Sequence, residues 1–532
     1  MQTSGPFCLQ IKELKRMKIF VLTLGALGMA ASAQAEPPRA LTASGQISGR
    51  IDGAVAQFLG IPYAAPPLRE NRWRSPQPVA SWSGVLEATA FAHDCMQNPF
   101  PGDEAPLRTA PAEDCLYLNV WKPAAAKPGV GLPVLVWIHG GAFVTGGTSP
   151  AIYDGSAFAR SGVVFVSFNY RLGRFGFFSH PALAAEAGKP IGNFALEDMV
   201  AALAWVRRNI AGFGGDPSRV TIMGESAGGT AVINLMTMPS ARGLFHGAIS
   251  MSGGGRSLLP TASIEKGEQV GLEFAKRHDI VDSGTAGLAA LRALPAATVQ
   301  GTNLFAERFA TPPTYVGGFV AEGTVLAGAS DRLMDAGKIA PVPVMIGMTS
   351  ADAGIAMARD KDGLFAGYGV QGPALRRAYD PVGTIDLPDL SRRLTGDQYM
   401  AEPARFVARH ALAAGQKAYV YRFGYVAESK RAEWKAGAPH ATDIPYFFDT
   451  VSARYGAATT PQDRKAAKLA NAYVINFVKS GDPNGKALPR WPAYDLAGEA
   501  LLQHDMKGNA QAGFDPFKEK LDLIEAFATT RP

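Results

Sequence analysis

The stretch VTIMGESAGG at residues 220–229 decides how this chain folds. Its first four residues form a short apolar run typical of a buried strand, and a helical pattern begins directly after the glycines. Glycines on both sides of a serine let the chain turn sharply between strand and helix, which raises the serine hydroxyl above the edge of a sheet. In this setting the pattern Gly-x-Ser-x-Gly predicts that Ser226 is a nucleophile.

Further apolar runs predict the sheet to which this strand belongs. They lie at residues 134–138, 163–168, 248–251, 342–346 and 418–423. Helical patterns alternate with them, for example at 196–210, where apolar residues fall on one face. Continuous apolar strands that alternate with helices indicate an α/β fold with a mostly parallel sheet covered on both faces.

The rest of the chain is expected to elaborate this single domain, which would span residues 36–532. The stretches 254–340 and 353–416 contain helical patterns but few strand signals, and we expect them to be insertions that form a cap or gorge over the sheet. The turn SGDPNG at 480–485 is expected to begin a C-terminal tail.

A glycine-rich loop, HGGAF at residues 139–143, follows the predicted strand 134–138. Backbone N–H groups exposed by such a loop can bind the negative oxygen of a tetrahedral intermediate, together with the N–H of the residue after the nucleophile, here Ala227. His139 is expected to orient this loop and not to act as the base.

The general base should follow the serine, because the order on a sheet of this kind is serine, acid, histidine. The candidates are His246, His278, His410, His440 and His504. His246 lies at the edge of a buried strand, where a packed structural role is expected. His278 and His410 lie in helical, charged segments. His504 lies beyond the last predicted strand. His440 falls in a loop after the strand 418–423, from which it can fold back over the serine, and is the predicted base.

The predicted acid is Asp352. The strand 342–346 runs into the turn GMTSADAG at residues 347–354, and Asp352 is the only carboxylate in that turn. A carboxylate just beyond a strand end can reach the far nitrogen of the histidine and fix its tautomer. Asp360 and Asp362 lie further on, in a stretch that is typical of a solvated surface.

Composition excludes several classes of protein. The chain has 532 residues, 47% of them hydrophobic and 18% charged, so it can bury a sizeable core. The net charge of +6 is scattered, with no basic run after residue 40, and a nucleic-acid partner is not expected. Three cysteines exclude a disulfide scaffold and a cysteine-rich metal site. No metal-ligand cluster or nucleotide-binding loop appears, so no metal and no cofactor is expected.

Residues 1–35 are expected to be a leader and not part of the fold. Met17-Lys18 opens a short basic region, residues 19–31 are almost entirely apolar, and Ala33-Gln34-Ala35 provides a small-x-small cleavage site. This is the anatomy of a secretory signal peptide, with translation starting at Met1 or Met17. The alternative is an uncleaved membrane anchor. The signal peptide predicts an exported protein, periplasmic or secreted, without a stable membrane anchor after cleavage.

Export would leave Cys95 and Cys115 as the only cysteines of the mature chain. In an oxidising compartment two such residues are most simply a disulfide. The alternative is a pair of buried free thiols.

Taken together, these residues make the chain resemble the type B carboxylesterases, the family that includes bacterial carboxylesterases and the cholinesterases. The similarity runs from FLGIPYA at 58–64 to Trp491-Pro492. Its most specific parts are EDCLYLNVW at 113–121 and the stretch from FGGDP at 213–217 to GESAG at 224–228.

The resemblance implies an α/β-hydrolase fold that hydrolyses carboxylic esters of small molecules without a cofactor. The roles it implies are Ser226 as nucleophile, Asp352 as acid, His440 as base, Gly141, Ala142 and Ala227 as the oxyanion hole, and Cys95–Cys115 as a disulfide.

Three positions depart from the family pattern. Most members have Glu followed by Gly at the acid position, where this chain has Asp352 and Ala353, and Ala142 stands where many relatives have a third Gly. In cholinesterases a Trp between the paired cysteines holds choline by a cation–π contact, whereas here the only aromatic residue in that interval is Phe100. Short-acyl aryl or alkyl esters are therefore expected as substrates, and choline esters are not.

Two kinds of alternative remain. A non-catalytic, cholinesterase-like binding protein would typically lack the serine or the histidine, and this chain has both. An amidase, or a lipase that acts on aggregated substrate, could use the same three residues, because the fold does not separate these reactions.

Overall fold

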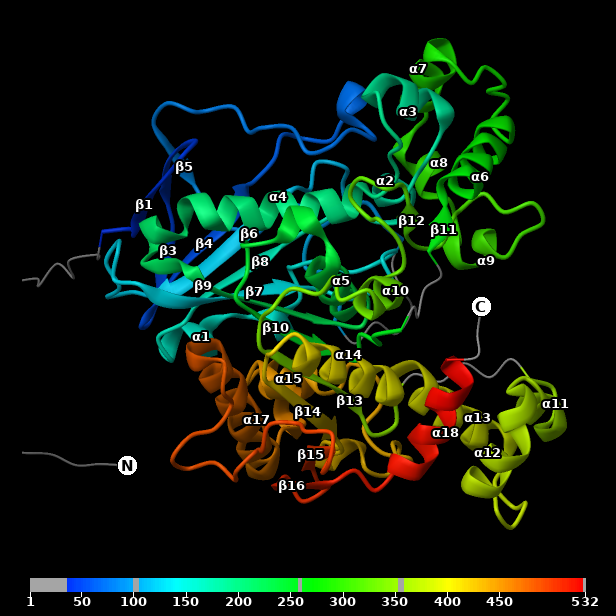
Figure 1. Cartoon of the computed structure of the whole chain (residues 1–532). Coiled ribbons are helices and arrows are strands. Elements are labelled where there is room, and N and C mark those ends of the chain that lie inside the picture. The colour runs from blue at the N-terminus through cyan, green and yellow to red at the C-terminus, as the bar shows by residue number, and fades with distance from the viewer. Residues whose placement is uncertain (1–35, 99–104, 257–260, 353–357, 530–532) are drawn as a thin grey trace, which may run out of the picture. The chain divides into compact units, whose positions relative to one another are not determined.

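A mixed sheet of 11 strands forms the centre of the computed structural model, which describes residues 36–98, 105–256, 261–352 and 358–529 (Figure 1). The strand order is β16-β15-β14-β13-β10-β9-β7-β8-β6-β4-β3. The six adjacent pairs from β15 to β8 are parallel, and the pairs at both ends are antiparallel. The strands are β3 (Arg50–Asp52), β4 (Val55–Pro62), β6 (Tyr117–Pro123), β7 (Leu132–Ile138), β8 (Val164–Phe168), β9 (Gly215–Glu225), β10 (Gly247–Met251), β13 (Val344–Thr349), β14 (Ala418–Phe423), β15 (Ala500–His504) and β16 (Ala510–Phe514).

Two smaller sheets and the helices complete the architecture. The small sheets consist of β1 (Arg39–Thr42), β2 (Gly45–Ser48) and β5 (Val85–Glu87), and of β11 (Ala262–Ser263) and β12 (Val320–Ala321). The α-helices are α1 (Ser156–Arg160), α2 (Gly173–Gly176), α3 (Pro181–Ala187), α4 (Phe194–Asn209), α5 (Ala227–Thr237), α6 (Ile264–Lys276), α7 (Thr285–Ala293), α8 (Ala296–Gln300), α9 (Leu304–Arg308), α10 (Ser330–Asp335), α11 (Lys361–Ala366), α12 (Gly372–Tyr379), α13 (Leu387–Gly396), α14 (Glu402–Ala413), α15 (Ile444–Phe447), α16 (Val451–Tyr455), α17 (Pro461–Ser480) and α18 (Lys518–Ala528).

The central strands are apolar on both faces because helices cover both faces. In β7, Val134, Val136 and Ile138 pack into one core with residues of α4, α5 and α14. The alternating residues Leu135 and Trp137 pack into a second core with residues of α1 and α17. The predicted α/β fold with a parallel sheet covered on both sides is confirmed.

All six strands predicted from apolar runs are present. The strand predicted at 342–346 begins instead at Val344, because Pro343 has no N–H to contribute to a sheet. The strands β4 and β6, which continue the sheet in antiparallel fashion, carry part of the sequence resemblance but were not predicted as strands.

Both predicted insertions divide into two parts. In the first, α6, α7, α8 and α9 form a group apart from the sheet, whereas α10 packs against α5 and α14. Figure 1 shows α6, α7, α8 and α9 gathered at one corner and α11, α12 and α13 at another. The helix α14 belongs instead to the sheet, because it packs against β13 and β14. The stretch 353–416 is therefore not a single insertion over the sheet.

The prediction of a C-terminal tail after residue 485 is wrong. Residues beyond the 480–485 turn form β15 and β16, which extend the sheet, and α18, which packs against α12 and α14. The buried side chains Leu521 and Ile524 attach α18 to the main core.

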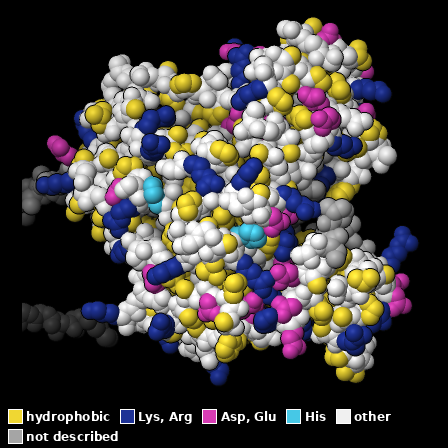
Figure 2. Space-filling model, viewed as in Figure 1, with side chains coloured by type: hydrophobic (Ala, Val, Ile, Leu, Met, Phe, Trp, Pro, Cys, Tyr) yellow, Lys and Arg dark blue, Asp and Glu magenta, His cyan; other side chains and the backbone are white. Residues whose placement is uncertain are grey.

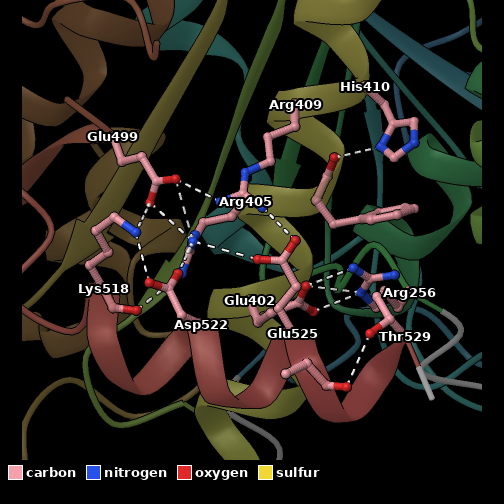
Figure 3. A network of polar contacts seen from close by, with 12 residues as sticks. Arg256, Glu402, Arg405, Arg409, His410, Glu499, Lys518, Asp522, Glu525 and Thr529 are labelled. Carbon is pink, nitrogen blue, oxygen red and sulfur yellow. Dashed lines mark hydrogen bonds and ion pairs between the residues drawn. The ribbon is translucent and has the colours of Figure 1, made fainter. Parts of the chain in front are cut away.

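Ion pairs also hold α18 against α14 (Figure 3). Arg405 of α14 is 2% exposed, and its guanidinium lies 2.6 Å from Asp522 and 3.0 Å from Glu499. Arg409, one turn later, contacts Glu499 at 2.6 Å and also pairs with Glu525. A buried guanidinium needs such carboxylates because an unpaired charge is costly in an apolar interior.

Charged side chains of both signs are interspersed over the face of the molecule shown in Figure 2. Within the described residues, no helix is long and apolar enough to cross a lipid bilayer.

We expect Arg405→Ala to destabilise the fold strongly. The substitution removes a buried guanidinium and breaks its ion pair with Glu499, which is 4% exposed, and breaking a buried pair typically costs about 3–5 kcal/mol. Lys518→Ala is the matched control, because Lys518 also pairs with Asp522, at 2.7 Å, but is 48% exposed. An exposed pair is worth less than about 1 kcal/mol. Urea unfolding followed by fluorescence measures both variants, and equal midpoints would contradict the importance of the buried cluster.

Candidate active site

Ser226 lies at the turn between β9 and α5, with φ +55° and ψ −121°. A residue with a side chain adopts this backbone conformation rarely and at a cost, so the turn must be held by its surroundings. Its N–H donates to the carbonyl of Met251 at 2.9 Å, and its carbonyl accepts from the N–H of Thr230 at 2.8 Å. A Cβ at Gly228 would lie 2.0 Å from the carbonyl oxygen of Ile138, so glycine is required there.

His440 connects Ser226 to Asp352. Its Nε2 lies 2.9 Å from the Ser226 Oγ, and its Nδ1 lies 2.6 Å from the Asp352 Oδ1. The loops that contain the histidine and the acid are joined by a backbone bridge, in which the N–H of Ala351 donates to the carbonyl of Ala438 at 2.9 Å. The structure thus brings together the three residues that the sequence analysis selected.

Asp352 is buried, with 6% exposure, and its second oxygen is also bound. The Ser252 hydroxyl donates to Oδ2 at 2.6 Å, and the Thr349 N–H donates to the same oxygen at 2.9 Å. Ser252 was not predicted from the sequence. The available signal was its position directly after β10, since the carboxyl ends of neighbouring parallel strands lie at the same edge of the sheet.

The loop after β7 approaches Ser226 closely. A Cβ at Gly140 would lie 3.1 Å from the Ser226 Cβ. Gly141 and Ala142 both have positive φ, +100° and +53°, and within the described chain their N–H groups have no hydrogen-bond acceptor. Ala227 begins α5, so its N–H is free of the intrahelical hydrogen bonds. The three predicted oxyanion donors therefore lie in two segments that flank Ser226.

His139 supports this loop. Its Nδ1 lies 2.9 Å from the Gly140 carbonyl oxygen, and its ring stacks on Tyr170 with centroids 4.3 Å apart. Burial lowers the pKa of His139 to about 4, so the ring is neutral at physiological pH.

Two further buried carboxyl groups lie near His440, and neither was predicted. Glu225 Oε1 is 3.3 Å from the His440 Nε2, and burial raises the pKa of Glu225 to about 8. Burial, together with Asp352, raises the pKa of Asp443 to about 7, and its Oδ2 accepts from the Tyr421 hydroxyl at 3.1 Å.

The charge on His440 depends on these neighbours. Burial by itself lowers the pKa of His440, but Glu225 and Asp352 outweigh that effect and raise it. Glu225 and His440 each favour the charged form of the other. A proton arriving on His440 therefore has a carboxyl group near each ring nitrogen, that of Asp352 at Nδ1 and that of Glu225 at Nε2.

A cavity of about 400 Å³ opens beside Ser226 and His440. Its lining is mainly apolar and includes the glycine-rich loop after β7 and the residues that follow His440. Among the described residues of the two predicted insertions, only Phe305 of α9 lines it. The described part of the stretch 353–416, which was expected to help form a cap or gorge, therefore contributes no residue to this cavity.

The other candidate histidines lie elsewhere. His246 is exposed and not packed as expected, because it precedes β10 at the surface. His504 is buried at the end of β15, where burial lowers its pKa to about 4. His278 contacts Phe274, and His410 lies 3.3 Å from Asp335. None of these residues lines the cavity at Ser226.

Cys95 and Cys115 form a disulfide, as predicted. Its surroundings are held by Asp94, which accepts hydrogen bonds from the Thr109 hydroxyl at 2.6 Å and from the Thr148 N–H at 2.9 Å. Phe100, the aromatic residue between the cysteines, lies outside the described residues.

Many known proteins are similar to this chain in sequence and fold. Residues 36–367 and 386–523 match the sequence profile of the Carboxylesterase family. The chain is 33% identical over 520 residues to a fumonisin B1 esterase of Sphingopyxis macrogoltabida. The aligned region covers 93% of this chain and 92% of the relative. It is 32% identical over 520 residues to a human cocaine esterase, covering 88% of each protein.

Solved structures agree with the sequence relatives. A PNB esterase superposes with a TM-score of 0.77 at 29% identity, covering 91% of this chain and 99% of that structure. The chain therefore belongs to the Carboxylesterase family and is a carboxylic ester hydrolase with the α/β-hydrolase fold.

Proposed function

We propose that this hydrolase cleaves esters through a covalent acyl-enzyme on Ser226, with His440 as general base and Asp352 as the acid that orients it. The observation that carries the proposal is the geometry of His440, whose two ring nitrogens lie 2.9 Å from the Ser226 Oγ and 2.6 Å from the Asp352 Oδ1. A hydrogen-bonded carboxylate at Nδ1 holds a proton there, which leaves Nε2 free to accept the serine proton.

In the first half of the reaction, the Ser226 Oγ attacks the ester carbonyl carbon while its proton passes to the His440 Nε2. The carbonyl oxygen becomes negative and accepts hydrogen bonds from the N–H groups of Gly141, Ala142 and Ala227. The carbon–oxygen bond to the alcohol then breaks, and the alcohol oxygen takes the proton from Nε2. In the second half, water follows the same route and releases the acid.

Glu225 supports the charged intermediate in this scheme. Proton transfer makes the His440 ring positive, and the Glu225 carboxyl 3.3 Å from Nε2 stabilises that charge when it ionises. Asp352 and Asp443 contribute in the same direction. The imidazolium formed during acylation is thus favoured by three buried acids.

The substrates we propose are neutral esters with a short acyl group, such as p-nitrophenyl acetate or butyrate, and hydrolysis should persist with EDTA present. Acetylthiocholine should be a poor substrate, because Phe100 is the only aromatic residue between Cys95 and Cys115 and no Trp is available there to hold a quaternary ammonium group.

We also propose that the protein is exported after removal of residues 1–35. The Cys95–Cys115 disulfide supports this proposal, because disulfides persist in oxidising compartments.

Ser226→Ala should lower kcat by several orders of magnitude while thermal unfolding stays unchanged, since the hydroxyl is required for acyl transfer and little else. An organophosphate should label the wild type in a one-to-one ratio and leave the variant unlabelled. Rates of p-nitrophenyl butyrate hydrolysis and mass spectrometry measure both effects. A variant that retains substantial activity would show that another nucleophile carries the reaction.

Ser252→Ala should lower kcat about ten-fold or more without raising KM, because Asp352 loses a hydrogen bond to a charged group worth about 1.5–3 kcal/mol. Ser250→Ala is the matched control. Ser250 is equally buried, but its hydroxyl donates to the Gly229 carbonyl and does not face the acid. Similar losses in both variants would mean that packing, and not the orientation of Asp352, is what Ser252 provides.

The pH profile of kcat/KM should rise with pH as His440 loses its proton, because only neutral imidazole accepts the serine proton. Its midpoint should lie above 6.5, the ordinary histidine value, since neighbouring carboxylates raise the pKa of His440. Glu225→Gln should move the midpoint to lower pH.

Glu322→Gln provides the control for this shift. Burial raises the pKa of Glu322 to about 7, but Glu322 binds Asn193 and does not line the active-site cavity. An unchanged midpoint in Glu225→Gln, or an equal shift in Glu322→Gln, would show that Glu225 does not specifically raise the pKa of His440.

A further inference from the structure

The cavity beside His440 has walls that indicate which half of the ester occupies it. In the proposed reaction, on which this inference rests, the alcohol oxygen takes its proton from the His440 Nε2, so that oxygen must lie within hydrogen-bonding distance of this atom. Glu225, 3.3 Å from Nε2, lines the cavity. The residues that directly follow the histidine, from Ala441 to Pro445, supply four more of its lining residues. A group attached to the alcohol oxygen would therefore extend into this space.

The cavity is large and apolar for an alcohol subsite. Its volume of about 400 Å³ is in the range of sites that enclose whole small molecules. Apolar side chains from three separate segments contribute to its wall, namely Ile152 and Tyr153, Ile444 and Pro445, and Phe305. A methyl or ethyl group would leave most of this space empty, whereas an aromatic or alicyclic group would displace water from it and gain contacts with these walls.

Phe305 lines the cavity and is partly exposed to solvent. It lies on α9 and is 46% exposed, although its ring is apolar. The helix is fixed beneath it, because Leu304 is buried and the Arg174 guanidinium, itself 1% exposed, pairs with Glu307 of the same helix. A rigidly held and half-exposed aromatic ring at the edge of a cavity is available to pack against a ligand.

We infer that this enzyme is selective for esters of bulky, apolar alcohols and that Phe305 is the residue that sets this selectivity. In this arrangement Phe305 contacts the alcohol half of the ester, and selectivity for acyl chain length should depend on other residues.

Phe305→Ala tests the inference, with Phe309→Ala as the matched control. Phe309 directly follows α9 and is 71% exposed, but it does not line the cavity. Two substrate pairs separate the halves of the ester. Ethyl acetate and 1-naphthyl acetate share an acyl group and differ in the alcohol, and p-nitrophenyl acetate and p-nitrophenyl hexanoate share the alcohol and differ in the acyl group.

In Phe305→Ala the kcat/KM ratio of 1-naphthyl acetate to ethyl acetate should fall about ten-fold or more, as expected for the loss of a large apolar contact. The hexanoate-to-acetate ratio should stay within about two-fold of the wild type. Phe305→Leu should recover most of the alcohol selectivity because it restores apolar bulk. Phe309→Ala should change neither ratio.

Three results would overturn the inference. They are an unchanged alcohol ratio in Phe305→Ala, a change confined to the acyl ratio, and an equal effect of Phe309→Ala. Thermal unfolding of each variant verifies folding, and Phe305→Leu gives a second test if the alanine variant is unstable. Organophosphate titration distinguishes failure of the inference about Phe305 from failure of the proposed function. If Ser226 is not labelled in the wild type, the proposed mechanism fails whatever the ester ratios are.

Discussion

The close approach of α5 to the end of β7 is the constraint on which the active site depends. The first turn of α5 lies so near the Ile138 carbonyl that residue 228 cannot carry a side chain. This approach places Ser226 in a backbone conformation that costs on the order of 1–3 kcal/mol. Burial of every residue from Ala227 to Thr237 offsets that cost, because it anchors the helix between the sheet and its neighbours. The strain at this turn therefore lies on Ser226.

The parallel sheet explains why the other groups meet Ser226. Its strands β9, β10, β13 and β14 are paired in register and end at the same edge. Ser226, Ser252 and Asp352 follow the first three of these strands within a few residues, and His440 returns to the same edge from the loop after β14. Ser226, Ser252 and Asp352 need only short turns to reach their positions, whereas the longer loop that contains His440 is held by the backbone hydrogen bond from Ala351 to Ala438. The geometry of the site is thus set by strand pairing together with this contact.

This arrangement accounts for what the sequence could predict. Ser226, Asp352 and His440 each occupy a loop after an apolar run, and order along the chain assigns a role to each. Asp352 is shorter than the Glu usual in this family, but the bridge between Ala351 and the histidine loop brings the two side chains within 2.6 Å. Ser252 and Glu225 were missed because a serine or a glutamate beside a strand end is common, and only tertiary contacts show that they face Asp352 and His440.

Other features could not be predicted because long-range contacts create them. The edge strand β16 has exposed residues on both faces, so its apolar signal is weak. The position of α18 depends on Arg405, which is separated from Asp522 by more than a hundred residues. The place of Phe305 at the cavity depends in the same way on the pairing of Arg174 with Glu307. For α18 and α9, a charged contact between distant segments contributes to the position of an element whose own sequence does not predict it.

The central claim is that Ser226 carries the acyl group during turnover. Mixing the enzyme with p-nitrophenyl butyrate, quenching with acid within one turnover, and mapping the peptides by mass spectrometry tests it most directly. The account predicts one butyryl group on the peptide that contains residues 224–228, located on Ser226, formed together with a stoichiometric burst of p-nitrophenol. A butyryl group on another residue would contradict it. A burst of p-nitrophenol without a butyryl group on Ser226 would contradict it as well.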